Sequence, residues 1–365
     1  MMPPKPLLRP TDRGLACAVG GLLVDPWQPA PVAVVTHAHA DHACRGCGRY
    51  YCAAAGAGVL RTRMGADAEI HAIEYGTRFT LADESGEAEL SFHPAGHVLG
   101  SAQVRIRAMR GAQDDRVWVA SGDYATLPNP TCDAFEPVAC DVFLTESTFG
   151  LPIYRWRPPA EVHARINDWW RENAGAGRTS VVFAYGLGKA QRVLAGLDAS
   201  IGPIGVHGAV DGLLGDYADA GVALPETVRA VGEHKAALKG RGMIVAPPST
   251  MGTPWLRSLA GGRREGGGMR TAMASGWMAV RGRRRWRSVD AGFVLSDHAD
   301  WPGLLDAIER TGARSIGVTH GSSEALARYV REVRGLDAFV VPTRYTAEDD
   351  ANAESDDTPD DGGGA

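Results

Sequence analysis

The stretch VAVVTHAHADH, residues 32–42, decides the fold class and the chemistry that we expect of this chain. Its first half is a short apolar, β-branched run, which predicts a buried strand. Three histidines and one aspartate follow at once, and imidazole and carboxylate groups are the ligands that zinc and related divalent ions take. So many ligands on one short loop can feed two adjacent ions, which usually lie about 3.5–4 Å apart. The stretch therefore predicts a two-metal site at the end of a strand.

Other apolar runs along the chain also end in a polar group. We expect buried strands over residues 21–25, 117–120, 142–145, 293–296 and 316–319, and these lead into Asp25, Asp123, Glu146, His298 and His320. Further strands are expected over 181–184 and 243–246, and helices over 161–173, 189–196 and 301–310. This alternation indicates an α/β protein. Because open α/β sheets bind ligands at the carboxyl ends of their strands, the polar groups should form one site.

Length and composition narrow the class of protein. A chain of 365 residues, 44% hydrophobic and 22% charged, can form two domains or one large domain with an insertion. The composition excludes collagen, coiled coil and wholesale disorder. No apolar run approaches the roughly 20 residues of a membrane span, and the first residues lack the apolar core of a signal peptide. We therefore expect a cytoplasmic protein that does not contact a membrane.

Charge is distributed unevenly. The formal net charge is −5, but residues 346–365 carry eight acidic and no basic side chains, so the rest of the chain has a net charge of +3. This acidic tail is expected to be disordered, and a mildly basic body suits a polyanionic partner. The six cysteines should be reduced thiols. Cys44, Cys47 and Cys52 suggest a zinc knuckle only weakly, because no second CxxC follows at a suitable spacing, so a structural or incidental role is expected.

The HxHxDH string at 37–42 resembles the metallo-β-lactamase superfamily, and later motifs follow the order of that family. Asp25 matches an acid that orients a metal ligand from behind, His97 lies in PAGHVLGS (94–101), and Asp123 lies in SGDY (121–124). The resemblance implies an αββα sandwich that holds two divalent ions, expected to be Zn²⁺, which Mn²⁺ could replace. It assigns one ion to His37, His39, His97 and Asp123, and the other to Asp41, His42, Asp123 and His320.

Three further motifs, LTESTF (144–149), SDHAD (296–300) and VTHG (318–321), resemble motifs A, B and C of the β-CASP nucleases. The resemblance implies an α/β β-CASP domain inserted into the sandwich. We therefore expect a first part over 1–150, the insert over 151–290, a return segment over 291–345 and the tail over 346–365. It also implies catalytic roles: Glu146 supports His298 beside the scissile phosphate, and Asp41 accepts the proton of the attacking water.

Candidate substrate contacts lie in the expected insert. The turn AYGLGKAQR (184–192) resembles a β-CASP strand–turn–helix, in which Lys189 could contact phosphate. Ser275 and Trp277 resemble a turn that lines the β-CASP side of the cleft, with Trp277 stacking on a base or packing in the core. The arginine-rich run around Trp286 could place Arg283 and Arg285 on a sugar–phosphate backbone, and a solvated loop is the alternative.

At the level of the whole chain, LRPTDRGL (8–15), FGLPIYRW (149–156) and SDHADW (296–301) resemble the bacterial ligase-associated DNA exonucleases. That resemblance implies an exonuclease that acts on DNA ends in repair, on single strands, beside an ATP-dependent DNA ligase and a helicase. His320 instead favours RNA as the substrate, because a histidine in motif C is associated with RNA-processing β-CASP nucleases. An RNA-processing exo- or endonuclease therefore stays open. Intact ligands disfavour a catalytically idle binding subunit, and motifs A to C disfavour a small-molecule hydrolase of the same superfamily.

Overall fold

The computed structural model describes residues 6–259, 268–280 and 289–344, and these form two compact units. Unit 1 contains the chain up to Pro128, Cys132–Arg155 and the segment from His298 onward. Unit 2 contains Asn129–Thr131 and Trp156–Asp297. Composition places the joints after residues 150 and 290, whereas the contacts within each unit place them after Arg155 and Asp297. The acidic tail expected over 346–365 lies outside the described residues.

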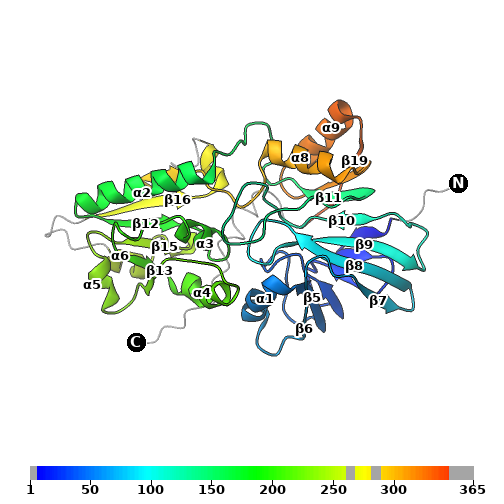
Figure 1. Cartoon of the computed structure of the whole chain (residues 1–365), viewed down its shortest axis with the longest axis horizontal. Helices are drawn as coiled ribbons and strands as arrows, with labels where there is room; N and C mark the ends of the chain where they lie inside the picture. The colour runs from blue at the N-terminus through cyan, green and yellow to red at the C-terminus, as the bar shows by residue number, and fades with distance from the viewer. Residues whose placement is uncertain (1–5, 260–267, 281–288, 345–365) are drawn as a thin grey trace. The chain divides into compact units, whose positions relative to one another are not determined.

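Unit 1 is built on two mixed sheets (Figure 1). The first contains, in spatial order, β1 (Leu8–Thr11), β2 (Gly14–Cys17), β3 (Leu23–Val24), β4 (Val32–Val34), β5 (Arg49–Ala53) and β6 (Ile70–Ile73). The second contains β19 (Asp337–Val340), β18 (Ser315–Thr319), β11 (Val142–Glu146), β10 (Trp118–Ala120), β9 (Ala102–Arg110), β8 (Gly86–Pro94) and β7 (Phe79–Asp83). Strands β3 to β6 pair in parallel, as do β10, β11, β18 and β19.

The alternation of side chains explains why β10 and residues 142–144 of β11 are apolar at every position. Trp118 and Leu144 face the core shared by the two sheets, whereas Val119 and Phe143 face a second core that includes side chains of α8 (Trp301–Thr311) and α9 (Ser323–Arg334). A strand covered on both faces needs apolar residues at every position. The remaining helical segments of unit 1 are η1 (Ala54–Gly56) and α1 (Ala57–Met64).

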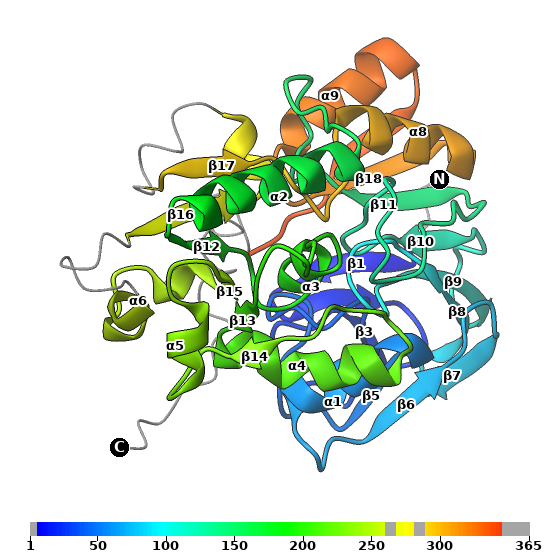
Figure 2. The same cartoon turned by 60° about the vertical axis from the view of Figure 1, so that its left-hand side comes forward.

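Unit 2 contains one parallel sheet, in the order β14 (Val228–Arg229), β13 (Ile204–Val206), β15 (Met243–Ala246), β12 (Thr179–Phe183), β16 (Met269–Ala274) and β17 (Ala291–Phe293). Its helical segments are α2 (Pro159–Gly175), α3 (Lys189–Leu194), α4 (Gly208–Asp219), α5 (His234–Leu238), η2 (Pro248–Thr250), α6 (Pro254–Leu259) and η4 (Gly276–Ala279). Helix α2 lies against β12 and β17, with Val162, Ile166 and Trp170 in the core (Figure 2). Their spacing of four residues puts them on one helix face.

The α/β class expected from the sequence is confirmed, while the assignment to the metallo-β-lactamase and β-CASP folds stays a prediction. The strand expected over 293–296 is wrong in its bounds, because β17 ends at Phe293. No helix of the described segments is long and apolar enough to cross a membrane. All six cysteines are free thiols, and the Sγ atoms of Cys44 and Cys47 lie 3.7 Å apart.

Candidate metal centre

The polar side chains singled out in the sequence come together in unit 1, mainly where parallel strands end. Asp25 follows β3, the loop 37–42 follows β4, and Asp123 follows β10. Glu146 is the last residue of β11, and His320 directly follows β18. His97 lies in the turn between β8 and β9, and His298 lies shortly before α8. Segments far apart in the chain therefore supply one cluster: His37, His39, Asp41, His42, His97, Asp123, Glu146, His298 and His320.

The first group of ligand atoms belongs to His37, His39, His97 and Asp123, and these atoms lie within 4.8 Å of one another. His39 Nδ1 is 3.1 Å from both His37 Nε2 and His97 Nε2. Donors that share one zinc ion, each about 2.0–2.2 Å from it, stand roughly 3–4 Å apart. The spacing and the donor chemistry fit a single divalent ion.

The second group contains Asp41, His42 and His320. The buried His42 Nε2 atom has no hydrogen-bond partner among the described residues, although Asp41 Oδ2 and Asp123 Oδ2 each lie 3.4 Å away. An ion bound to this nitrogen would remove the cost of burying it unsatisfied. The same Asp123 oxygen is also 3.6 Å from His37 Nε2, so one carboxylate faces both groups. This is where a bridging ligand belongs.

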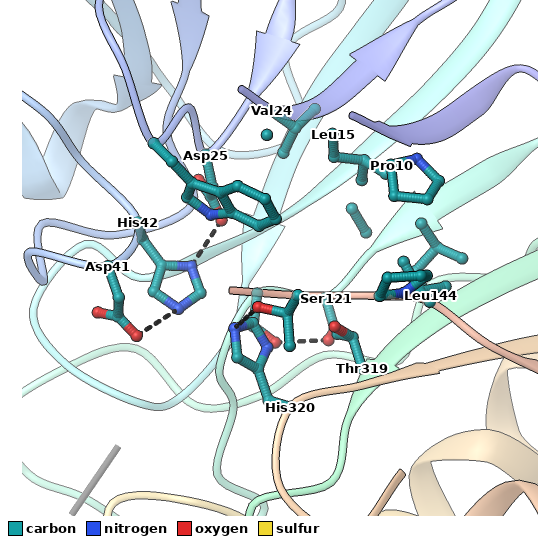
Figure 3. A pocket seen from close by; sticks show the side chains of 17 residues that line it. Pro10, Leu15, Val24, Asp25, Asp41, His42, Ser121, Leu144, Thr319 and His320 are labelled. Atoms are coloured by element: carbon teal, nitrogen blue, oxygen red, sulfur yellow. Dashed lines mark hydrogen bonds and ion pairs between the residues drawn. The ribbon is translucent and has the colours of Figure 1, made fainter. Parts of the chain in front are cut away.

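Asp25 and Thr36 hold the ligand loop from behind. Asp25 Oδ1 accepts the Thr36 backbone N–H at 2.8 Å, and Oδ2 accepts the Thr36 hydroxyl at 2.6 Å. Asp25 Oδ2 also accepts a hydrogen bond from His42 Nδ1 at 2.7 Å (Figure 3). Because the hydroxyl gives its one proton to Asp25, it accepts from His37 Nδ1, 3.1 Å away. Both histidines then present Nε2 to the cluster. Sequence analysis singled out Asp25 and missed Thr36, whose role depends on the pairing of β3 with β4.

Backbone strain gathers at the same place. Asp25 and His320 are the two non-glycine residues with positive φ, 46° and 51°, within the described ranges. Such conformations cost energy and often mark functional sites. The turn before Asp123 needs Gly122, which has φ 56° and whose added Cβ would lie 2.6 Å from the Thr36 side chain. The fold therefore accepts local strain in order to place these ligands.

The carboxylates and imidazoles of the site shift the pKa of one another. Burial and the neighbouring imidazoles lower the pKa of His37 well below its usual value, and burial lowers that of His320. Burial also opposes charge on His42, but Asp41 and Asp123 outweigh it and raise the pKa of His42 well above the usual value. In turn, although burial works against it, His42 holds the pKa of Asp41 and of Asp123 below the usual range. The carboxylates of Asp41 and Asp123 thus favour a positive charge beside them, which suits the binding of cations.

Glu146 and His298 form a separate pair beside the first group. Both side chains are buried, and His298 Nδ1 lies 3.0 and 3.1 Å from the two Glu146 oxygens. The backbone N–H of Tyr124 donates to Glu146 Oε1 at 2.8 Å. The ring centroids of His298 and His97 are 4.6 Å apart, so the pair stands next to a candidate metal ligand. Glu146 thereby fixes the orientation of the His298 ring.

A cavity opens beside the second group. It occupies about 610 Å³, including the part open to solvent, and Asp41, His42 and His320 form its polar wall. Apolar side chains from both sheets of unit 1 form much of the rest (Figure 3), among them Pro10, Leu15, Val24, Trp27, Leu144 and Val341. The centre is therefore accessible from a largely apolar recess.

The expected substrate contacts belong to unit 2. Lys189 is buried, with Nζ 2.7 Å from Asp297 Oδ1, and the Gly188 N–H already donates to Gln191 Oε1 at 2.7 Å. Ser275 and Trp277 are also buried, and the Ser275 hydroxyl accepts the backbone N–H of Trp277 at 3.3 Å. Arg283 and Arg285 lie outside the described residues. The structure thus shows Lys189 in an internal ion pair where the sequence suggested a contact with phosphate.

The geometry defines a class of protein: an α/β chain with a buried cluster of histidines and aspartates suited to divalent ions. Comparison with known protein families gives no match. The chain is 29% identical over 330 residues to a probable DNA ligase of Opitutus terrae. The matched region covers 90% of this chain and 30% of that protein. It is 26% identical over 161 residues to the transcription termination factor FttA of Thermococcus kodakarensis, covering 42% of this chain and 24% of that protein. The chain thus matches less than a third of the length of either relative.

A solved structure of a protein of unknown function from Enterococcus faecalis V583 is similar in fold. The TM-score is 0.54 at 11% sequence identity, and the match covers 86% of this chain and 79% of that chain. At this identity the likeness shows the fold alone.

Proposed function

We propose that this chain is a metal-dependent phosphodiesterase that acts as a DNA exonuclease in DNA end processing and repair. The observation that carries the proposal is the position of Asp123 Oδ2, 3.6 Å from His37 Nε2 and 3.4 Å from His42 Nε2. A carboxylate between two ligand groups is typical of sites with paired ions, which recur in phosphodiester hydrolysis. The similarity to a protein named as a probable DNA ligase supports DNA as the substrate.

The two ions, proposed as Zn²⁺ with Mn²⁺ as a substitute, would supply an activated water and neutralise charge on the phosphate. His37, His39 and His97 would hold one ion, Asp41, His42 and His320 the other, and Asp123 both. Asp41 would accept a proton from a water held at this site. His298, held by Glu146, stabilises the charge of the phosphate or gives a proton to the leaving oxygen.

For substrate and partners, we propose single-stranded DNA, an ATP-dependent DNA ligase and a helicase. A relative named as a ligase, of which this chain matches 30%, supports a link to ligation. The net charge of +3 over residues 1–345 implies few contacts with the backbone phosphates, and therefore weak non-specific affinity and a salt-sensitive rate. In this proposal unit 1 is a metallo-β-lactamase domain and unit 2 its β-CASP insert.

A second candidate is an RNA-processing nuclease with the same metal chemistry. Two observations favour it: the histidine at position 320, in the motif C position, and the 26% identity with a transcription termination factor. The two candidates share the roles of the ligands and differ in the nucleic acid that is cut.

Digestion of matched end-labelled strands distinguishes these candidates. Linear single-stranded DNA and RNA, labelled at the 5′ or 3′ end, and a closed single-stranded DNA circle are incubated with Zn²⁺ or Mn²⁺, and Asp123→Ala serves as the control for contaminating nucleases. We expect stepwise release of nucleotides from linear DNA and an intact circle. Cleavage of RNA alone would establish the second candidate, and circles cut as fast as linear strands would show an endonuclease. No cleavage of either nucleic acid with either ion would refute the proposal.

A further inference from the structure

Helix α3 of unit 2 carries a buried cation that faces a buried anion. Lys189 Nζ lies 2.7 Å from Asp297 Oδ1, and the two side chains are 3% and 2% exposed. The ammonium also lies 4.6 Å from the centroid of the Tyr185 ring. The interior of unit 2 therefore neutralises this charge, and the ammonium does not face solvent.

A second buried cation, the guanidinium of Arg192, lies about one helical turn after Lys189 in α3. Arg192 is 1% exposed, and its Nη1 donates to the backbone carbonyl of Ser296. Ser296 and Asp297 lie beyond the end of β17 at Phe293, where the ladder to β16 no longer holds the backbone. Two consecutive residues are thus fixed by two cations of the same short helix.

These two residues lead directly into His298. Asp297 ends the segment Trp156–Asp297 of unit 2, and His298 begins the return segment of unit 1. Within unit 1, the backbone N–H of Ala299 donates to the backbone carbonyl of Tyr124 at 2.6 Å, and His298 Nδ1 lies 3.0 Å from Glu146 Oε2. Within unit 2 the backbone directly before His298 is therefore held by α3, and within unit 1 the backbone directly after it is held by Tyr124.

We propose that Lys189 and Arg192 are positioning residues for His298, an inference that rests on the proposed function. Burial of a lysine–aspartate pair carries a desolvation cost, and an apolar pair of similar size often stabilises a protein as well. Contacts made by a charged group also depend on the orientation of the two groups, so they hold the backbone of Ser296 and Asp297 in one position. Stability alone does not require such an orientation. A catalytic group displaced by 1 Å can lose about 100-fold in rate, so a fixed backbone before His298 has a kinetic consequence.

Kinetics of the full chain on its nucleic-acid substrate test the inference. Lys189→Met and Arg192→Met should lower kcat roughly 10- to 100-fold, with KM within about twofold and with unchanged metal content. Lys239→Met is the matched control, because this exposed lysine lies in the same unit. A raised KM with unchanged kcat in Lys189→Met would overturn the inference, because it would show that Lys189 binds phosphate.

The double variant Lys189→Met/Asp297→Leu separates positioning from stability. It replaces the ion pair by an apolar pair, so it should melt close to the wild type even if Lys189→Met does not fold. We expect its kcat to stay low. A kcat equal to that of the wild type would show that the pair is only structural.

A spectroscopic measurement keeps the inference separate from the proposed function. With ¹⁵N-labelled histidine, the ring signals of His298 are assigned by their loss in His298→Ala. They should shift or broaden in the double variant and remain unchanged in Lys239→Met. An unchanged His298 signal in the double variant overturns the inference, whereas a wild type that cuts neither DNA nor RNA refutes the proposed function alone.

Discussion

Asp123 and His42 determine most of the electrostatics of the candidate centre. Asp123 Oδ2 faces His42 Nε2 at 3.4 Å and His37 Nε2 at 3.6 Å, and the carboxylates of Asp41 and Asp123 raise the pKa of His42 against the effect of burial. Without ions, the proton on His42 therefore provides the counter-charge of the site. A bound cation would take its place, since a metal ligand must give up its proton.

Metal binding should accordingly release protons. We expect the protons to come from His42, because its pKa is raised in the ion-free protein and Nε2 can coordinate only when neutral. Metal affinity should fall as the pH decreases. A pH indicator mixed with ion-free protein and Zn²⁺ in weak buffer measures the release. The exposed His71 provides the control variant, His71→Gln, and an equal release from His42→Gln and wild type would contradict the prediction.

The same raised pKa makes the stability of the ion-free protein depend on pH. Charge on His42 stabilises the fold fully below the unfolded-state pKa of about 6.5, and this contribution is lost as the pH rises through the raised folded-state pKa.

Glu146→Gln and His298→Ala should keep their metal and lose rate. Neither residue is assigned as a ligand, and general acid–base groups contribute roughly 10²- to 10⁴-fold. Elemental analysis beside a cleavage assay measures both quantities. Asp123, Glu146 and His298 also lie within 4.8 Å of one another, so loss of an ion from His298→Ala would show that this histidine is a ligand instead.

The sequence predicted these residues unequally well. His37, His39 and His42 could be found because their spacing on one loop carries the signal. Thr36 and the Tyr124 N–H could not, since each acts only through a partner brought close by the fold, Asp25 and Glu146. The ion pair of Lys189 with Asp297 could not be predicted either, because the two residues lie 108 positions apart in the sequence.

At the level of elements, the turns that follow the strands set the positions of the ligands. Gly122→Ala should destabilise the protein by about 1–3 kcal/mol, because its φ of 56° disfavours a side chain and the added Cβ would meet Thr36. Gly212→Ala within α4 should instead stabilise it by about 0.5–1 kcal/mol, since nothing lies within 4 Å of the added atom. Thermal melts of both variants check the opposite signs, and equal shifts would contradict the argument.

Elements with continuous apolar runs were predictable from the sequence. The strands expected over 117–120 and 142–145 correspond to β10 (Trp118–Ala120) and β11 (Val142–Glu146), with both faces covered. Strand β9 was missed although AQVRIRAMR alternates apolar and polar residues, as half-buried strands do. Helix α9 was missed although Leu326 and Val330 mark one apolar face. The signal was present in both cases, but weaker than that of a continuous apolar run.

For the whole molecule, charge distribution should matter for affinity and not for the fold. Deletion of residues 346–365, which lie outside the described part of the chain, removes eight acidic side chains and no large apolar one. Metal content and melting temperature should stay unchanged, and affinity for single-stranded DNA should rise slightly at low salt. Binding titrations at two salt concentrations measure this rise. A marked fall in melting temperature would show that the tail contributes to the fold.

Elemental analysis of the protein measures how many metal ions each chain holds. We expect two divalent ions per chain in active wild-type protein. In Asp123→Ala we expect loss of at least one ion and nearly all cleavage, with the fold retained by circular dichroism. Active protein that holds no metal, or Asp123→Ala that keeps two ions and full activity, would contradict the proposed two-metal site.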